Sequence, residues 1–220
     1  MTLVLASLLK ITGRKVPIVA LLTRVSEAKK ARLLRFSHSR IARIILPPES
    51  QREFAICKLG VPPGKFVDLP WTVDTEFWHS EDSAATTTIS AAGGEMRDYA
   101  TLIRAMDGLD IPCHIAGSLD PNRRDWWRDD SDRAHALPSN VTVRPMSPVE
   151  LRELYERSRF VVLPLQSTDS DNGITSMNEA WSMQRGVVCS QVAGQRNAFT
   201  PGVEGVWVPP GMLMHSEKRS

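Results

Sequence analysis

The chain has 220 residues, enough for one complete domain together with part of a second one. Its 42% hydrophobic and 24% charged residues are ordinary for a globular protein. The three cysteines are far apart and form no CxxC pair, which argues against a disulfide framework or a zinc site. The apolar start of the chain is interrupted by Lys10, Arg14 and Lys15, so neither a membrane-spanning helix nor a signal peptide is expected.

The net charge of +2 conceals an uneven distribution. Residues 1–65 hold thirteen Lys and Arg against three Glu, a net of +10, and the rest of the chain has a net of −8. A basic region of this kind is attracted to an anionic membrane surface or an anionic substrate, unless its charges simply belong to solvated helix faces. Nucleic acid is not expected as a partner, because the region lacks interleaved aromatic residues and a recognisable binding module.

Strands and helices alternate along the chain. In the first region the expected strands are residues 16–22, 41–46 and 65–69, and the expected helices are residues 26–36 and 48–59. Gly60 is a favourable stop for the second of these helices. Residues 72–87 are polar with few apolar anchors and are typical of a linker.

The second region is more regular. The expected strands are residues 88–92, 111–116, 141–144, 159–165, 187–190 and 205–208, and the expected helices are residues 97–106, 148–157 and one that begins at residue 174. Strands separated by helices of about ten residues predict the α/β class, with a doubly wound parallel sheet.

Ligands of open α/β sheets bind outside the carboxyl ends of the strands, so residues that follow the strands are the candidate site residues. After the strand at 88–92, Gly93 and Gly94 would let backbone N–H groups approach a phosphate, and Arg97 could bind its oxygens. A plain tight turn with a solvated Arg97 would explain the same residues. Ser118 follows the next strand, where Gly117 would let a ligand pass close to the backbone or would merely end the strand.

The third candidate segment follows the strand at 159–165 and comprises Asp171, Gly173, Ile174, Thr175 and Glu179. Two interpretations of Glu179 remain open. It could close an S-x-x-E capping box with Ser176, or its carboxylate could accept hydrogen bonds from the hydroxyl groups of a ligand sugar. A carboxylate would repel a phosphate, so phosphates are expected at Arg97 and at the backbone N–H groups.

The chain resembles the retaining glycosyltransferases of the GT-B fold, the large family-4 type that uses a nucleotide-diphosphate sugar. The resemblance covers roughly residues 40–211. It consists of short matching pieces, and the order and spacing of these pieces are more specific than any single piece. The pieces are residues 50–54, 59–65, 73–77, 93–94, 97–103, 137–141, 150–155, 173–175, 179–180, 186–188 and 205–211. The resemblance implies a Rossmann-like fold, with the donor bound by the second domain.

The resemblance implies roles for individual residues. Asp171 and Glu179 stand eight positions apart, as the paired acids of the family do, and Glu179 would hold the ribose of the donor. Arg97 takes the place of a phosphate-binding lysine, whereas Gly94 stands where the family has a second cation. Backbone groups of residues 173–175 would face the donor sugar and phosphate. No catalytic residue, metal ligand or cofactor other than the sugar donor is assigned.

The resemblance also predicts an incomplete enzyme. Residues 1–78 would be a partial acceptor-side domain, 79–87 a linker, 88–211 the donor-binding domain, and 212–220 a tail unrelated to the family. The expected acceptor is lipid-linked or a polysaccharide of the cell envelope, and the expected location is the cytoplasm, with peripheral contact at the inner membrane surface through the basic region. The alternative is a nucleotide-sugar-binding fragment or pseudoenzyme. A sugar-nucleotide epimerase agrees less well with residues 97–99 and 173–175.

Overall fold

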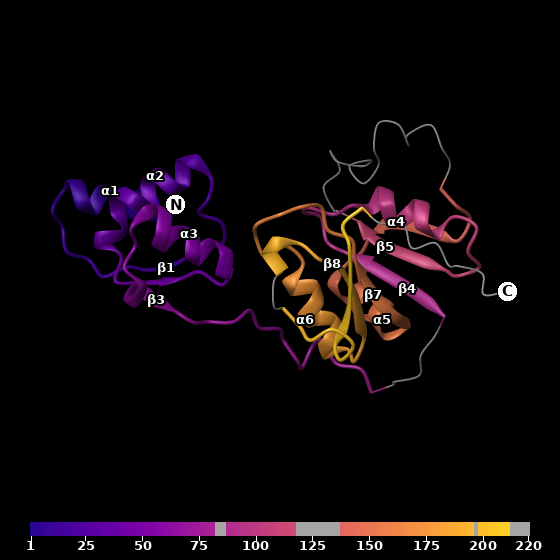
Figure 1. Cartoon of the computed structure of the whole chain (residues 1–220). Coiled ribbons are helices and arrows are strands. Elements are labelled where there is room, and N and C mark those ends of the chain that lie inside the picture. Colours follow the sequence, from indigo (N-terminus) through magenta and orange to yellow (C-terminus); the bar gives the residue numbers. More distant parts are fainter. Residues whose placement is uncertain (82–86, 118–136, 196–197, 212–220) are drawn as a thin grey trace. The chain divides into compact units, whose positions relative to one another are not determined.

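The computed structural model describes residues 1–81, 87–117, 137–195 and 198–211 (Figure 1). They form two compact units, which are described separately below. The first unit comprises Met1–Trp71 with the short segments Asp169–Asp171 and Ala193–Gln195, and the second comprises the other described residues from Thr72 onward. Each unit is a parallel sheet with flanking helices, so the predicted α/β class with Rossmann-like parallel sheets is confirmed.

The first unit contains a small sheet with helices on one side of it (Figure 1). Its elements are α1 (Thr2–Ile11), β1 (Val19–Leu21), α2 (Ala28–Ser37), β2 (Arg43–Ile45), α3 (Glu49–Leu59) and β3 (Phe66–Val67). The strands pair in parallel in the order β1-β2-β3. Helix α1 was not among the expected elements, although its buried residues Leu3, Ala6 and Leu9 recur at helical spacing.

A single hydrophobic cluster joins α1, α2 and α3 to the strands of the first unit. Gly60 ends α3 in the left-handed conformation, with φ of 70°, as predicted. At the start of α3, Gln51 is 1% exposed. Its Oε1 accepts hydrogen bonds from the N–H groups of Val25 (2.7 Å) and Ser26 (3.0 Å), and its Nε2 donates to the carbonyl of Asp169 (3.1 Å). One buried amide therefore holds three segments of the unit together.

The second unit contains a six-stranded parallel sheet. Its elements are β4 (Thr88–Ala92), α4 (Tyr99–Met106), β5 (Cys113–Gly117), β6 (Val141–Pro145), α5 (Pro148–Glu156), β7 (Ser158–Leu163), α6 (Ile174–Ser182), β8 (Gly186–Ser190) and β9 (Gly205–Val208). The predicted strands are all present, with ends that differ by a few residues. The first helix begins at Tyr99 rather than at Arg97, because Asp98 is its N-cap and accepts a hydrogen bond from the N–H of Thr101.

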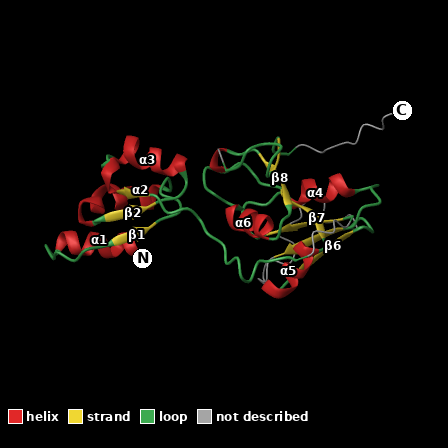
Figure 2. Cartoon of the chain, turned by 90° about the horizontal axis from the view of Figure 1, so that it is seen from below, coloured by secondary structure: helices red, strands yellow, loops and turns green. Residues whose placement is uncertain are grey.

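Helices of the second unit pack against both faces of its sheet. On one face, Tyr99, Leu102 and Met106 of α4 belong to a cluster with Ile89 and Ile115 of the strands. On the other face, a second cluster joins α5 and α6 to inward residues of β7 and β8. Figure 2 shows α4 and α5 on opposite sides of the strands. This arrangement is the doubly wound sheet that the alternating pattern predicted.

The order of the strands, β6-β5-β4-β7-β8-β9, places a topological switch point between β4 and β7. From β4 the chain continues to β5 and β6 in one direction, and from β7 it continues to β8 and β9 in the other. The connections therefore leave the carboxyl ends of β4 and β7 on opposite sides, which opens a crevice there. Among the described residues, no helix is both long and apolar enough to cross a membrane.

Candidate functional site

Arg97 lies at the switch point, in the loop between β4 and α4. Its side chain is 7% exposed, and it donates hydrogen bonds from Nε to the carbonyl of Ala92 (3.0 Å) and from Nη1 to the carbonyl of Glu95 (2.8 Å). No ion pair joins Arg97 to another residue that the structure describes. The interpretation of Arg97 as a solvated residue beside a plain turn is therefore wrong. A buried cation without a counter-charge suits an anionic ligand.

Two glycines lie against the guanidinium group of Arg97. A Cβ atom at Gly93 would come within 2.3 Å of Nη2, and one at Gly173 within 3.6 Å of the same atom. Both glycines have positive φ, 104° and 97°, which favours glycine over other residues. The loops that follow β4 and β7 therefore meet around this one side chain, although they are far apart in the sequence. Gly94 lies in the same loop and supplies no second cation.

The loop that carries Arg97 is fixed by backbone hydrogen bonds to the segment after β7. The N–H of Asp98 donates to the carbonyl of Pro164 (2.8 Å), and the N–H of Gln166 donates to the carbonyl of Met96 (2.9 Å). In addition, the hydroxyl of Tyr99 donates to the carbonyl of Gly93 (2.8 Å). Sequence reasoning did not assign Gln166 or Tyr99 to the site, because their roles depend on contacts across the sheet.

Helix α6 begins directly beside this loop. Its N-cap is Gly173, which provides no side-chain cap, so the N–H groups of Ile174 and Thr175 lie in the first turn without a capping side chain. The capping-box interpretation of Glu179 is wrong, because it requires Ser176 to be the N-cap, three residues after the actual N-cap, Gly173. Glu179 instead lies in the second turn, where it is free for another role.

Glu179 is a partly buried carboxyl group. Burial raises its pKa from 4.5 to about 7. The carboxyl group of Glu179 makes no hydrogen bond or ion pair with the side chain or backbone of a described residue. The charge of Glu179 also adds to the effect of burial that holds the pKa of Tyr155 well above its usual range. The carboxyl group therefore titrates near neutral pH, and its oxygen atoms are available to accept hydrogen bonds from a ligand.

Two predicted site residues are not placed with this group. Ser118 lies outside the described residues, although Gly117 before it ends β5, a neighbour of β4. Asp171 belongs to the first unit, where the indole Nε1 of Trp71 donates a hydrogen bond to its carboxylate. Burial raises the pKa of Asp171, against the effect of that hydrogen bond. Its pairing with Glu179 of the second unit stays a prediction.

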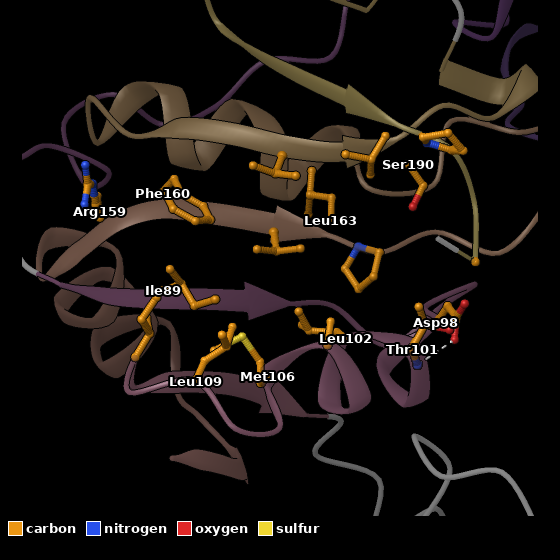
Figure 3. A pocket seen from close by; sticks show the side chains of 18 of the residues that line it. Ile89, Asp98, Thr101, Leu102, Met106, Leu109, Arg159, Phe160, Leu163 and Ser190 are labelled. Carbon is orange, nitrogen blue, oxygen red and sulfur yellow. Dashed lines mark hydrogen bonds between the residues drawn. The ribbon is translucent and has the colours of Figure 1, made fainter. Parts of the chain in front are cut away.

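A separate cavity of about 230 Å³ lies on the face of the sheet that α4 covers. Figure 3 shows its lining, in which Ile89 and Phe160 face the side chains of Leu102, Met106 and Leu109. Its polar residues lie at the ends, where Asp98 is already engaged as the N-cap of α4. None of the predicted site residues lines this cavity, and an apolar wall does not suit a diphosphate.

Solved structures share this fold over nearly the whole chain. HepE of Anabaena, solved with UDP, is 13% identical with a TM-score of 0.73, and the match covers 95% of this chain and 62% of HepE. Sucrose-phosphate synthase of Thermosynechococcus elongatus is 16% identical with a TM-score of 0.64, covering 84% of this chain and 49% of the other. The lipopolysaccharide outer core galactosyltransferase WaaB is 13% identical with a TM-score of 0.57, covering 95% and 66%.

The chain therefore spans less than two thirds of the length of these structures. No curated protein matches it in sequence. The sequence profile of one family, described as "Glycosyl transferases group 1", matches residues 96–216, which is more than half of the chain. The matched range begins beside Arg97, includes α6, and extends past Gly211 into the segment that was expected to be unrelated. The chain belongs to this family of group 1 glycosyl transferases.

Proposed function

We propose that the second unit binds a nucleotide-diphosphate sugar at its switch point and that the complete enzyme transfers the sugar to an acceptor with retention of configuration. The observation that carries this proposal is the position of Arg97. It is a buried cation that forms no ion pair within the described part of the chain, at the crevice where two loops and the uncapped start of α6 meet. HepE, which has the same fold, was solved with UDP, and this supports a donor of the same class.

The proposed contacts divide between phosphate and ribose. The diphosphate would be bound by Arg97 and by the N–H groups at residues 173–175, where the partial positive charge of the helix N-terminus adds to the attraction. The Glu179 carboxylate would accept hydrogen bonds from ribose hydroxyls. Gly94 supplies no second cation. The N-terminus of α6 would therefore stabilise more of the phosphate charge than it would beside two cationic side chains.

In the transfer step these groups would stabilise the leaving group. Breaking the bond between sugar and phosphate leaves negative charge on the nucleoside diphosphate, and a preorganised cation with oriented N–H groups lowers the energy of that charge. Residues that act on the acceptor are not assigned. No cofactor beyond the sugar donor is proposed.

The second candidate function is nucleotide-sugar binding without transfer. It is favoured by the small sheet of the first unit, which has three strands. Binding without transfer or donor hydrolysis would select this function. Transfer of sugar from the same donor to any acceptor would select the enzyme.

The test of the donor site is a thermal-shift titration of the full chain with UDP and with GDP. One of them should raise the melting temperature, with about 2.7 kcal/mol of stabilisation at roughly one hundred times its Kd. Arg97→Ala and Glu179→Ala should remove the effect, whereas Arg159→Ala and Glu153→Ala, at exposed positions of the same unit, should retain it. No shift with any nucleoside diphosphate would exclude the proposed donor site.

We further propose a lipid-linked or polysaccharide acceptor of the cell envelope and a cytoplasmic location, with peripheral contact at the inner membrane surface. Support comes from the net charge of +10 over residues 1–65 and from Lys29, Arg32 and Arg35, which are exposed on α2. Vesicles of phosphatidylglycerol should bind the chain at low salt and release it at high salt. Equal binding to uncharged vesicles would contradict this contact.

A further inference from the structure

Tyr99 is the first residue of α4 and follows the loop that carries Arg97. Its side chain is fully buried, and its ring packs in the hydrophobic cluster between α4 and the sheet. Its hydroxyl reaches back along the loop and donates a hydrogen bond to the carbonyl of Gly93 (2.8 Å). The core therefore fixes the ring of Tyr99, and the hydroxyl of Tyr99 fixes the loop of the candidate site.

The hydrogen bond falls on the residue of this loop with the greatest backbone freedom. Gly93 directly follows β4 and has φ of 104°, a conformation that glycine adopts readily and other residues rarely do. A glycine carbonyl can turn more easily than that of any other residue, so an acceptor bond to a buried donor restricts it strongly. The hydroxyl of Tyr99 thus holds the turn after β4 in one conformation.

The position of Gly93 determines the position of the Arg97 guanidinium. Nε and Nη1 of Arg97 donate to the carbonyls of Ala92 and Glu95. Nη2 lies against Gly93, where an added Cβ atom would come within 2.3 Å of it, and close to Gly173 at the start of α6. If the carbonyl of Gly93 turned, it could accept a hydrogen bond from Nη2 in place of a ligand. A fixed carbonyl prevents this competition.

The hydroxyl of Tyr99 remains a hydrogen-bond donor at neutral pH. Burial holds the pKa of Tyr99 well above its usual range, although the neighbouring Arg97 guanidinium acts in the opposite direction. A neutral hydroxyl can donate to the carbonyl of Gly93 and accept from a guanidinium at the same time. The positive charge of Arg97 is therefore not cancelled by a tyrosinate, and it is available to an anion.

We propose that Tyr99 is a positioning residue of the donor site: its hydroxyl fixes the carbonyl of Gly93 and thereby holds Nη2 of Arg97 in place for the diphosphate. The inference rests on the proposed donor site and adds to it a residue that does not touch the ligand. The role belongs to the hydroxyl alone, because a phenylalanine ring would fill the same space in the core and leave the carbonyl of Gly93 without this donor.

The first test compares Tyr99→Phe with Tyr155→Phe in the full chain. Tyr155 is the matched control, because it is also a fully buried tyrosine of the second unit, but its hydroxyl makes no hydrogen bond to the loop that carries Arg97. In titration calorimetry with UDP-glucose, Tyr99→Phe should bind about tenfold more weakly, a loss of ~1.4 kcal/mol, and Tyr155→Phe should bind as the unchanged chain does. Equal losses would overturn the proposal. Circular dichroism melting verifies that both variants are folded.

A second measurement follows Arg97 in the absence of a ligand. The Nε–H group of Arg97 is buried and bonded to the carbonyl of Ala92, so its NMR signal, identified by its loss in Arg97→Lys, should exchange slowly with solvent. Exchange should be faster in Tyr99→Phe and unchanged in Tyr155→Phe, which a general effect of tyrosine removal would not produce. An Arg97 signal that is the same in Tyr99→Phe as in the unchanged chain would overturn the positioning role.

A third measurement leaves Tyr99 in place and therefore does not depend on the folding of Tyr99→Phe. The chain has two tyrosines, so in Tyr155→Phe the signal of tyrosine labelled with ¹³C at Cζ belongs to Tyr99. Saturating UDP-glucose should shift this signal, because the diphosphate would bind the neighbouring guanidinium. Bound UDP-glucose with an unshifted signal would overturn the proposal alone. Failure of the unchanged chain to bind UDP-glucose would contradict the donor site itself, and the proposal with it.

Discussion

Each of the two units buries a long polar side chain that contacts several of its segments, and these two side chains, Gln51 and Arg97, differ in charge. In the first unit Gln51 is neutral, and both ends of its amide are engaged with groups of the same unit. In the second unit Arg97 is charged, and it donates hydrogen bonds to the carbonyls of Ala92 and Glu95 without an ion pair to a described carboxylate. Gln51 is satisfied and serves the structure. Arg97 carries a charge that no described carboxylate pairs with, and a buried cation of this kind suits an anionic ligand.

The two sheets also differ in how completely their faces are covered. The second unit covers both faces of its sheet with helices and has a hydrophobic cluster on each. The first unit has one cluster and a face with exposed apolar residues. The second unit therefore builds its candidate site from its own residues, whereas the first unit leaves apolar side chains exposed on one face of its sheet.

The largest expected effect separates Arg97 from Gln51. Arg97→Ala should weaken binding of UDP-glucose about 100-fold, ~2.7 kcal/mol, because it removes the buried positive charge. Titration calorimetry measures the loss. Arg97→Lys should retain part of the affinity through its charge, and Gln51→Ala should retain all of it. Equal losses of affinity in Arg97→Ala and Gln51→Ala would contradict the view that Arg97 binds the ligand and Gln51 only supports the fold.

The next effect concerns the fit of Gly93 around Arg97. Gly93→Ala should lower the free energy of unfolding by about 2–3 kcal/mol, because its Cβ would clash with the guanidinium and φ is positive. The matched control is Gly108→Ala, which also has positive φ but nothing within 4 Å of the added atom. It should show the backbone strain alone, about 1 kcal/mol. Chemical denaturation compares the two, and equal losses would mean that Arg97 does not fill this space.

A smaller effect is expected at the polar centre of the first unit. Gln51→Leu should destabilise that unit by about 1–2 kcal/mol, because the N–H groups of Val25 and Ser26 lose their buried acceptor. Hydrogen exchange should increase in α2 and α3 and stay unchanged in β4 and β7. Faster exchange throughout the second unit would show that the stability of the second unit depends on Gln51 as well.

The smallest effect is the pH dependence of Glu179. Burial raises its pKa from 4.5 to about 7, so the folded chain binds more protons than the unfolded chain between these values. Stability should therefore fall as the pH rises through this range. Glu179→Gln should remove that fall and be about 1 kcal/mol more stable than the unchanged chain at pH 8, an amount reduced by the partial exposure of the group. Parallel stability curves for the two proteins would contradict the shift.

The same variant links stability to binding. Because an ionised carboxylate accepts stronger hydrogen bonds from ribose hydroxyls than a protonated one, the affinity for UDP-glucose should rise between pH 6 and pH 8, a range in which its diphosphate does not titrate. Glu179→Gln should bind with the same affinity at both pH values. A rise that persists in this variant would assign the pH dependence to another group.

The sequence predicted the doubly wound sheet and its strands because alternating apolar runs and helical segments are local patterns. It also predicted Arg97 and Gly173 as site residues from their places after strands. It could not predict that Arg97 is buried, since this depends on Gly173 and on backbone contacts after β7. The two interpretations of Glu179 depend on which residue is the N-cap of α6. The capping box needs Ser176, and the structure has Gly173, three residues earlier. Helix α1 was missed although its buried residues have helical spacing, because its uncovered apolar side obscures the amphipathic pattern.

The most direct test of the donor site is its location. Hydrogen exchange of the full chain should be measured by mass spectrometry with and without saturating UDP-glucose. Protection confined to residues 92–99 and 173–180 is the predicted result. Protection of the apolar cavity between α4 and the sheet instead, or no protection in either segment under conditions where the nucleotide is bound, would contradict a donor site at the switch point between β4 and β7.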